Sequence, residues 1–380
     1  MDFSFSEEQR MLRAMVRDFA VKELEPLAAY IDETASFPME SIQKMAKLGL
    51  MGVPFPEEYG GSGGGSIEFT IVIEEISRIC AATALTYITT GLAGKPIFVF
   101  GNEDQRKRFI VPIAKGDKLP CFALTEPGAG SDATSIETRA VRQNGGYVIN
   151  GNKIFITNGG VADIALVFAT LDRSLRHRGI TAFVVEKGTE GFSVGKVEHK
   201  LGVRASSTAE LIFQDCFVPE TNRLGEEREG FRIAMAAIDS SRVSVAAQAV
   251  GIAQGALDKC LAYAKERQQF GQPIINFQAI QWMLADMATQ IEAARLLTYR
   301  VAYLDQNYLP FVKESCMAKV YAPEVAMFVT SKAIQIFGGY GYIKDYPLER
   351  YFRDARICGI YEGTDEMQRM TIARNLMREG

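Results

Sequence analysis

The sequence predicts an α+β multidomain fold: an N-terminal helical domain over residues 1–118, a central antiparallel β-sheet domain over 119–222 and a C-terminal four-helix-bundle-like domain over 223–380. Three observations predict it. The length of 380 residues suits two or three domains of roughly 150 residues each. The spacing of apolar residues changes from about 3.6 to about 2 near residue 119 and returns near residue 230. Glycines cluster at 60–65, 128–130, 145–160 and 338–341, where they predict breaks between successive helices or strands.

The first region has the periodicity of amphipathic helices. Ser6 and Gln9 form a capping-box pattern that predicts the start of a helix. Pro38 suits the first position of a second short helix, which ends near Gly49. Further helices are expected at about 67–80, 83–98 and 103–114. The stretch Gly60–Gly65 lacks the Gly-Lys-Ser/Thr ending of a phosphate-binding loop, so we interpret it as a surface turn.

The central region contains short runs of β-branched and aromatic residues. Asn-Gly or Asn-Gly-Gly sequences stand at 144–145, 150–151 and 158–160, and each predicts a turn between strands. The expected strands cover 147–149, 153–157, 164–168, 180–185 and 210–213. Short strands at about ten-residue spacing favour an antiparallel sheet over alternating strands and helices.

The helical period returns in the last region. Residues 231–268 are long enough for one helix of about ten turns. The stripe Ile280, Leu284, Met287, Ile291 and Ala294 predicts a second long helix. A third helix precedes the glycines at 338–341, and a short terminal helix starts at Thr364.

The composition excludes several classes of function. The net charge of −4 provides no general basic surface for nucleic acid or an anionic membrane. His177 and His199, which lie in polar loops, are too few for a multi-histidine metal site, so no metal is expected. Six scattered cysteines without a C-x-x-C pair suit a reducing compartment. Because the chain starts with acidic residues and no apolar stretch approaches the roughly 20 residues of a membrane span, we expect a cytoplasmic protein without a membrane partner.

A glycine-rich segment at 124–133 has three interpretations. It contains G-x-G-x-x-A after an apolar run, which is part of a dinucleotide-binding fingerprint. That fingerprint requires a sustained helix and a second parallel strand, whereas here a hairpin signal follows at 144–145. An ordinary strand-to-loop turn is the second interpretation. The third is a loop whose amides, with the hydroxyl of Ser131, bind an anion outside such a fold.

Two helix ends have both a structural and a functional interpretation. Arg267, Gly271 and Pro273 together form a pattern that is typical of a helix end. The functional interpretation is that Arg267 is a fixed cation that binds a phosphate. The segment 335–342 is a helix end followed by a turn, or a bare glycine surface that a ligand or another subunit approaches closely.

Glu362 also has two interpretations. It stands two residues before Thr364, a predicted N-cap, and acids near a helix start often do no more than complement the helix dipole. Yet it precedes the cap itself and is followed by Gly363. A carboxylate held there in a pocket could be a general base with a raised pKa.

Taken together, these segments resemble the acyl-CoA dehydrogenases, flavoproteins that introduce a trans double bond between the α and β carbons of an acyl-CoA thioester. Six segments carry the resemblance in order along the whole chain: 56–61 (PEEYGG), 125–132 (TEPGAGSD), 151–159 (GNK and ITNG), 266–271 (ER and FG), 335–341 (QIFGGYG) and 361–364 (YEGT). Each is weak alone, and their order makes the signal strong.

The resemblance implies that FAD is the cofactor. Its contacts would come from Phe122, Leu124, Thr125, Gly130, Ser131, Phe155, Ile156, Thr157, Arg267, Phe270, Gln278, Gln335, Ile336, Gly338, Gly339, Thr364 and Glu366. Some of these would reach FAD across a subunit interface, so a homotetramer built as a dimer of dimers is expected. Close relatives often have tryptophan where this chain has Phe155, and a phenylalanine can still stack on the flavin.

The resemblance also assigns the chemistry. Glu362 would be the catalytic base of a short- or medium-chain type enzyme, because members that carry the base on the long helix would need a glutamate near position 241, where this chain has Ser241. Glu362 would take the α proton while the β hydrogen leaves as hydride to flavin N5. Two donors, the backbone N–H of Glu362 and a ribityl hydroxyl of FAD, would stabilise the enolate oxygen. Substrate contacts are expected from Ser131, Asp239, Arg242 and Gly363.

The expected electron acceptor is an electron-transferring flavoprotein, which would place the enzyme in fatty-acid β-oxidation. One alternative is an acyl-CoA oxidase that uses O2, although such enzymes commonly carry an added C-terminal helical domain and this sequence ends at Gly380. Another is a non-catalytic acyl-CoA or flavin-binding protein; the presence of Glu362, the expected base, argues against it.

Residues 86–92 and the surroundings of Ser240 would set the depth of the acyl pocket. The lack of a basic residue in 82–91 argues against a dicarboxylic acyl group.

Overall fold

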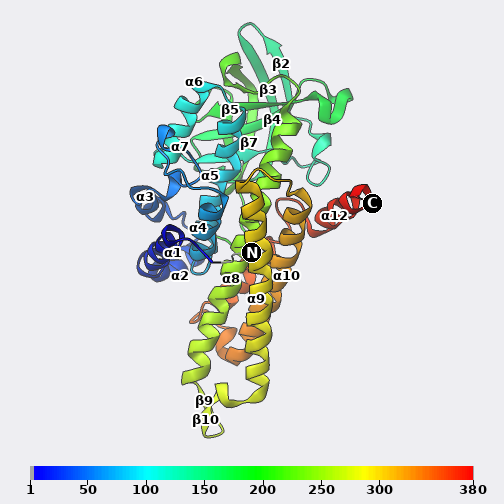
Figure 1. Cartoon of the computed structure of the whole chain (residues 1–380). Helices are drawn as coiled ribbons and strands as arrows, with labels where there is room; N and C mark the ends of the chain where they lie inside the picture. Colours follow the sequence, from blue (N-terminus) through cyan, green and yellow to red (C-terminus); the bar gives the residue numbers. More distant parts are fainter. Residues whose placement is uncertain (1–3, 380) are drawn as a thin grey trace.

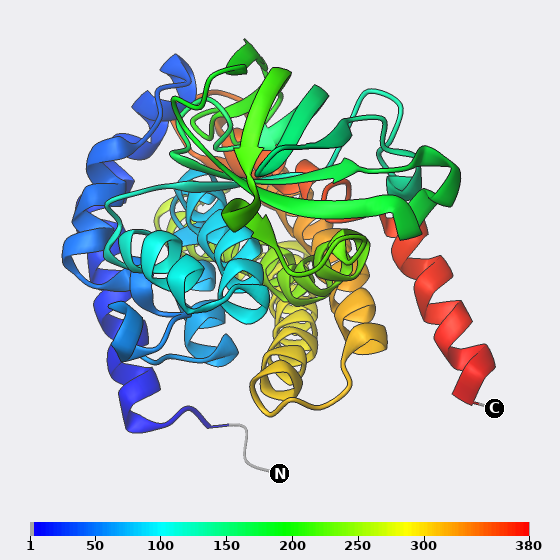
Figure 2. The same ribbon diagram turned by 90° about the horizontal axis from the view of Figure 1, so that it is seen from above.

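The computed structural model describes residues 4–379; residues 1–3 and 380, at the ends of the first and third expected domains, lie outside the described part. It has the predicted order of helices, sheet and helices. Figure 1 shows the sheet at one end of an elongated molecule and the long C-terminal helices reaching to the other end. Seen from above in Figure 2, the sheet lies across one side of the helices and the last helix extends away from them.

The N-terminal helices begin with the predicted capping box. Ser6 Oγ accepts from Gln9 N, and Gln9 Oε1 accepts from Ser6 N, so this prediction is confirmed. The helices are α1 (Glu7–Phe19), α2 (Glu25–Thr34), α3 (Met39–Lys47), α4 (Ser66–Ser77), α5 (Ala81–Phe100), α6 (Glu103–Gln105) and α7 (Val111–Lys115). Pro38 is the N-cap of α3 rather than its first residue. The single helix expected at 103–114 contains a π-helical turn at Arg106–Ile110.

The central sheet is mostly antiparallel. Its strands are β1 (Pro120–Ala123), β2 (Arg139–Gln143), β3 (Gly146–Thr157), β4 (Ile164–Thr170), β5 (Ile180–Glu186), β6 (Phe192–Val197), β7 (Thr208–Pro219) and β8 (Arg223–Leu224). The order is β6-β7-β3-β2-β4-β5-β8, and β1 pairs with β4. The hairpin predicted at 144–145 joins β2 and β3 and is confirmed. Two contacts, β1 with β4 and β2 with β4, are parallel, since long connections separate these strands.

The turn predicted at 150–151 is wrong, because β3 continues through it. The pairing of β3 with β7 shifts register between Ile149 and Gly151, so the chain bulges instead of reversing. Gly151 has a φ of 145°, and a Cβ there would lie 2.6 Å from the Cα of Thr138. Only glycine permits that close approach.

The C-terminal domain consists of long helices with one hairpin. Its elements are α8 (Gly230–Glu266), β9 (Gln268–Gln269), β10 (Gln272–Pro273), α9 (Gln278–Gln306), α10 (Val312–Phe337), α11 (Leu348–Ile357) and α12 (Asp365–Glu379). The single long helix predicted from 231 is confirmed, as is the stripe on α9, of which Leu284, Met287, Ile291 and Ala294 are buried. Helix α11 was not predicted from the sequence. Gly271 turns the hairpin between β9 and β10 rather than capping α8.

Helix α8 joins the two helical domains, because it packs against α4 and α5 as well as α9 and α10. Gly251 and Gly255 permit this contact. A Cβ on Gly251 would lie 2.3 Å from the carbonyl oxygen of Glu74, and one on Gly255 would lie 2.1 Å from that of Arg78. No helix within residues 4–379 is long and apolar enough to cross a membrane.

Candidate active site

Glu362 lies in the short connection between α11 and α12. Its φ is 53°, and that of Gly363 is 89°, so two consecutive residues have left-handed backbone. This region is costly for a residue with a side chain and is found where the surroundings enforce it. The Glu362 side chain is partly buried. The predicted base therefore stands on a backbone conformation that must be held in place.

Two buried side chains hold this connection. Lys319 Nζ, on α10, donates to the carbonyl of Gly363 at 2.7 Å and lies 3.2 Å from Asp365 Oδ1. Gln368 Nε2, on α12, donates to the carbonyls of Glu362 and Gly363, both at 2.9 Å. The Lys319 side chain is fully buried and Gln368 is 1% exposed. Neither residue stands out in the sequence, because a lysine inside an apolar helix also suits an exposed face.

Burial raises the pKa of Glu362 to about 7, and the positive charges of Arg242 and Lys319 oppose that rise. A carboxyl group with such a pKa can both hold and release a proton near neutral pH. Perturbed groups of this kind gather at functional sites. This is the property expected of a general base.

Arg242 and Asp239 form an ion pair on α8, three residues apart. Burial raises the pKa of Asp239, while the attraction of Arg242 opposes that rise. Arg242 is 8% exposed, and its Nε has no hydrogen-bond partner within residues 4–379. Ser241, where other members would carry the base, has a buried hydroxyl that likewise lacks a described partner. The unsatisfied Nε leaves Arg242 able to bind a polar group of a ligand.

Hydrogen bonds connect two segments that contain predicted FAD contacts, residues 122–131 and 153–157. Ile154 N donates to the carbonyl of Thr125 at 2.9 Å. Lys153 Nζ donates to the carbonyl of Leu124 at 3.1 Å and to Glu126 Oε1 at 2.6 Å. Glu126 in turn accepts from the backbone N–H groups of residues 137 and 138. Lys153 and Glu126 belong to sequence motifs of the resemblance, but no role was predicted for either residue.

The buried pair of Lys153 and Glu126 has coupled protonation. Burial lowers the pKa of Lys153 to about 8, and the charge of Glu126 limits the shift. Burial also opposes ionisation of Glu126, but Lys153 and the N–H groups of residues 137 and 138 together outweigh burial, so the pKa of Glu126 is lowered. The side chains are 0% and 4% exposed. The pair thus holds the loop at 124–130 against β3 through buried hydrogen bonds, and we call it the strap.

Phe155 stands out on this side of the sheet. It is 60% exposed and has a φ of 57°, at a register shift between Lys153 and Ile156. Side chains alternate along a strand, so Ile156 points into the core, where it is 2% exposed, and Thr157 is only partly buried. Phe155 and Thr157 are thus accessible, whereas Ile156 can offer a ligand only its backbone.

The glycines of the loop border open space. A Cβ added at Gly128 or Gly130 would meet no atom within 4 Å. Ser131, beside them, is exposed. Nothing in the protein itself therefore requires glycine here, and a ligand that approaches the backbone closely gives a reason for it. These features fit the flat ring and phosphates of a flavin nucleotide.

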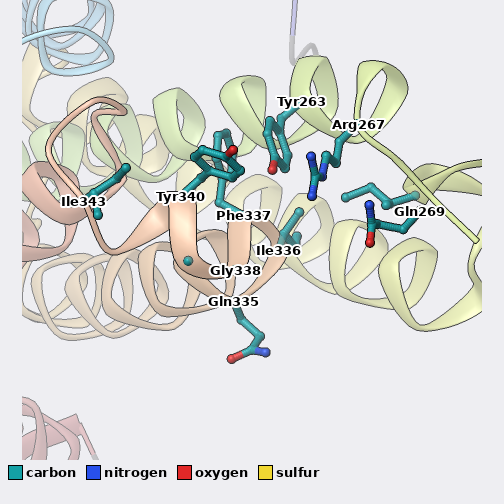
Figure 3. Close-up of a pocket in the computed structure, with 11 residues that line it drawn as sticks. Tyr263, Arg267, Gln269, Gln335, Ile336, Phe337, Gly338, Tyr340 and Ile343 are labelled. Atoms are coloured by element: carbon teal, nitrogen blue, oxygen red, sulfur yellow. The ribbon is translucent and has the colours of Figure 1, made fainter.

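A separate pocket of about 420 Å³ lies where α8 and α10 end. Arg267, Gln335, Ile336, Gly338 and Gly339 line it (Figure 3), and the guanidinium carbon of Arg267 stands 5.6 Å from the centre of the Tyr340 ring. Figure 3 shows Gln335 pointing away from Arg267. Open space surrounds Gly338 and Gly339 as well. Phe270 is 94% exposed at the hairpin, and Gln278 is exposed at the start of α9.

The predicted FAD residues therefore form two groups in one chain. No residue of the β domain lines the pocket beside Arg267, and Figure 1 places β9 and β10 at the end of the molecule opposite the sheet. Thr364 and Glu366 belong to neither group but to the start of α12, where Thr364 Oγ1 lies 3.5 Å from Met367 N. Glu366 is exposed. Among residues 4–379, no cluster of three or more histidines, cysteines or acids could hold a metal.

Three family models match successive parts of the chain. The acyl-CoA dehydrogenase N-terminal domain matches residues 6–117, the middle domain residues 121–216 and the C-terminal domain residues 228–377.

Curated relatives match along the full length. The short-chain specific acyl-CoA dehydrogenase of Clostridium acetobutylicum is 51% identical and each chain covers 100% of the other. The acryloyl-CoA reductase (NADH) of Anaerotignum propionicum is 50% identical, over 100% of this chain and 96% of that one.

Solved structures have the same fold. Butyryl-CoA dehydrogenase from Megasphaera elsdenii matches with a TM-score of 0.97 and 46% identity, over 99% of this chain and 100% of that one. A chain in the structure described as the electron transferring flavoprotein of Acidaminococcus fermentans matches with a TM-score of 0.98 and 48% identity, over 100% of both chains.

Proposed function

Because the chain belongs to the acyl-CoA dehydrogenase family, we propose that it removes the α and β hydrogens of an acyl-CoA thioester and yields a trans-2-enoyl-CoA. The short-chain specific and butyryl-CoA relatives favour a short acyl group. One observation carries the proposal for this chain. Glu362, a carboxyl group with a pKa raised to about 7, stands on a strained backbone that Lys319 and Gln368 hold.

Glu362 takes the α proton. An α C–H beside a thioester is a very weak acid, so its removal needs a base of matched pKa and a stabilised enolate. Binding of the acyl chain would exclude water from Glu362 and make the carboxylate more basic. Arg242 and Lys319 keep the deprotonated form accessible.

The backbone of Glu362 offers the enolate a donor. Its N–H forms no hydrogen bond with any residue in the range 4–379. Such a free N–H, fixed by the hydrogen bonds to the carbonyls of Glu362 and Gly363, can donate to the thioester oxygen as negative charge develops there. One residue would thus both remove the proton and help to stabilise the product of its removal.

The residues present fit FAD as the cofactor. Phe155 and Thr157 would hold the ring with the backbone of Leu124 and Thr125, and Gly130 and Ser131 would border it. Arg267, Phe270, Gln278, Gln335, Ile336, Gly338 and Gly339 would hold the nucleotide part, with Thr364 and Glu366 also near the cofactor. When bound, FAD supplies the acceptor for the β hydrogen, which leaves as hydride.

The separation of the two FAD groups supports an assembly of subunits. A cofactor held by both groups needs the sheet end of one chain and the Arg267 end of another, which is consistent with a homotetramer built as a dimer of dimers. Helix α12 adds support, since Gln368 is its one buried residue while Met377 is 76% exposed. A partner subunit would cover such a helix.

We propose that the electrons pass to an electron-transferring flavoprotein, which the A. fermentans match favours. A role in fatty-acid β-oxidation is part of this proposal. All six cysteines are free and buried, which suits the cytoplasm. An oxidase differs in one measurable way: its reduced flavin would reoxidise rapidly in air with product bound.

A second candidate function is the reverse reaction, reduction of a short 2-enoyl-CoA, favoured by the 50% identical acryloyl-CoA reductase. Glu362 would then return the proton to the α carbon, for which a pKa near 7 serves equally well. Kinetics in both directions with the reduced and oxidised electron-transferring flavoprotein would decide which direction is faster.

The proposed function is tested by mixing the flavin-loaded protein anaerobically with straight and branched acyl-CoAs. Bleaching of the flavin by butyryl-CoA is expected, with weaker bleaching by longer or branched thioesters. Glu362→Gln should retain the yellow colour and bind the thioester but not bleach. Bleaching by Glu362→Gln at the wild-type rate, or no bleaching by any acyl-CoA, would contradict the proposal.

A further inference from the structure

Asn158 lies between the predicted flavin segment and the predicted wall of the acyl pocket. It directly follows Thr157, an expected FAD contact, and it is 0% exposed. Its side-chain Nδ2 donates to two main-chain carbonyls, those of Thr86 on α5 and Pro120 on β1, both at 3.3 Å. Residues 86–92 are expected to line the acyl group. This one amide therefore connects the flavin side of the site with the acyl side.

The backbone of Asn158 is held as well as its side chain. Its N–H donates to the carbonyl of Ser207 at 2.7 Å, and its carbonyl accepts from the N–H groups of Val161 and Ala162, at 2.9 and 2.8 Å. Its φ is 63°, in the left-handed region that asparagine adopts more readily than most residues with a side chain. The chain thus changes direction directly after Thr157, and hydrogen bonds on both sides fix that change.

The turn alone does not explain an asparagine at this position. The Oδ1 of Asn158 is buried and has no hydrogen-bond partner among residues 4–379. Burial of an unpaired carbonyl destabilises a fold, so such a group calls for an explanation. Glycine would permit the same backbone without that cost, and Gly159 and Gly160 follow directly. What asparagine adds here is the pair of hydrogen bonds from Nδ2.

A second side-chain amide connects helix α5 with the proposed base. Gln248 Nε2, on α8, donates to the carbonyl of Ala81 at 2.9 Å, where α5 starts. Gln248 Oε1 accepts from the hydroxyl of Tyr361, the residue before Glu362. Ala81 and Thr86 are separated by about 7.5 Å of helical rise. The flavin segment and the segment of the base are thus both attached to the same short stretch of α5.

We propose that Asn158 is a positioning residue for the hydride step: through the start of α5 it fixes Thr157 relative to the acyl group and to Glu362. In that step the β C–H bond breaks and its hydrogen leaves with the electron pair to the flavin, while the α proton passes to Glu362. The inference rests on the proposed function, since it assumes that Thr157 contacts FAD and that α5 lines the acyl group. Transfer between two bound groups depends steeply on their distance, and a misplacement of about 1 Å can lower a rate about a hundredfold.

The first test replaces Asn158 by glycine, which keeps the left-handed turn and removes the amide. In Asn158→Gly we expect the rate constant for flavin bleaching by butyryl-CoA to fall by at least about tenfold, with an unchanged dissociation constant for the thioester. Deuterium on the β carbon should slow the variant by a larger factor than the wild type, because hydride transfer limits the variant more. The effect of deuterium on the α carbon should not increase. An unchanged rate constant, or an unchanged β-deuterium effect, would overturn the inference.

A second variant covers the case that glycine loosens the turn too much for the protein to fold. Asn158→Asp has nearly the same size, and a buried carboxyl group keeps its proton and can donate it to one of the two carbonyls. Its rate constant should therefore be lower than that of the wild type, again with a larger β-deuterium effect. Wild-type values of both quantities would contradict the inference.

The matched control is Asn222→Ala. Asn222 is also a buried asparagine, and its Nδ2 donates to the carbonyl of Val184 at 2.9 Å. Its side-chain partners, Val184 and Arg108, lie outside the candidate site. The control should lose stability but keep the wild-type rate constant and isotope effects. An increase of the β-deuterium effect in Asn222→Ala would show that any loss of stability produces it, and would count against positioning by Asn158.

Hydrogen–deuterium exchange in the protein without FAD tests the connection without catalysis. In Asn158→Gly the amides of 82–90 and 121–123 should exchange faster than in the wild type, whereas Asn222→Ala should leave them unchanged. Wild-type exchange in both segments, with normal bleaching by butyryl-CoA, would leave the proposed function intact and contradict the inference. Faster exchange while no acyl-CoA bleaches the wild-type flavin would contradict the proposed function, and with it the role in hydride transfer, but not the connection between the segments.

Discussion

Lys319 Nζ donates a hydrogen bond of 2.7 Å to the carbonyl oxygen of Gly363, the residue that follows the proposed base. The ammonium group is buried, and it lies 3.2 Å from Asp365 Oδ1. Burial lowers the pKa of Lys319, while Asp365 opposes that change. A cationic donor here performs two tasks. It anchors the left-handed backbone, and its charge stabilises the ionised form of Glu362.

Replacing Lys319 should therefore affect the position and the pKa of Glu362 together. Lys319→Met removes both the donor and the charge, so we expect kcat to fall by at least about tenfold and the pKa in the pH profile of flavin bleaching to rise above that of the wild type. Gln368→Leu removes only neutral donors and should lower kcat without that pKa change. Equal pH midpoints for Lys319→Met and Gln368→Leu would argue against a charge effect.

The wild-type pH profile follows from the raised pKa of Glu362. The base must be ionised to accept the α proton, so the rate constant for bleaching should fall about tenfold per pH unit below a midpoint near 7 and level off above it. Stopped-flow bleaching by butyryl-CoA from about pH 5.5 to about pH 9 measures this. A flat profile across neutral pH would contradict the assignment.

The same pKa predicts a stability effect. A carboxyl group whose pKa is higher in the folded than in the unfolded chain binds its proton more tightly when folded, so stability is lost as the pH rises from the ordinary value of 4.5 to about 7. Glu362→Gln cannot ionise, and we expect it to be more stable than the wild type by about 1–2 kcal/mol at alkaline pH and nearly equal to it at acidic pH. Urea unfolding at both pH values checks the difference, and Glu366→Gln, an exposed glutamate, is the control.

The buried pair of Lys153 and Glu126 beneath the loop at 124–130 predicts that protein stability and FAD binding can be changed separately. Lys153→Met leaves Glu126 buried and unpaired and should lower the free energy of unfolding by about 3–5 kcal/mol. The double variant Lys153→Met/Glu126→Leu should regain much of that stability, because no buried charge remains. It should still lose FAD more readily, since Leu124 has lost its donor. Flavin content after gel filtration measures the second effect; full retention by the double variant would refute the strap's role.

Phe155 should influence the cofactor and not the fold. Its side chain is 60% exposed, so Phe155→Leu should leave the free energy of unfolding of the protein without FAD within about 0.5 kcal/mol of the wild type. If the ring stacks on the flavin, the change should weaken FAD binding about tenfold and shift the visible absorption bands. Val141→Ala, at an exposed position on β2, should change neither property.

Much of the fold was predictable because its signals are local. The capping box at Ser6, the hairpin after β2 and the length of α8 depend on a few neighbouring residues and are confirmed. The continuation of β3 through Asn150 and Gly151 was not predictable, since an Asn-Gly sequence suits a bulge as well as a turn. The close approach of Thr138 decides between the two. Helix α11 was missed because its apolar positions are interrupted by charged residues that pair within the fold, such as Arg353 with Asp32 and Glu349.

Some residues of the candidate site were likewise predictable from the sequence and others were not. Glu362 and the glycine segments could be found because their motifs have an order along the chain. Lys319, Gln368 and the pair of Lys153 with Glu126 could not be assigned roles, since a hydrogen bond to a backbone carbonyl leaves no pattern in side-chain types.

Helix α10 carries Lys319 near one end and Gln335 near the other, about 24 Å apart by helical rise. With FAD shared between subunits as proposed, one helix would serve the proton chemistry of its own chain and the nucleotide of a neighbour. Two defects, one beside each of these two positions of α10, would then complement each other. Mixed assemblies of Glu362→Gln and Gly338→Val subunits, each inactive alone, would contain some sites built entirely from intact halves, and activity would reappear on co-expression.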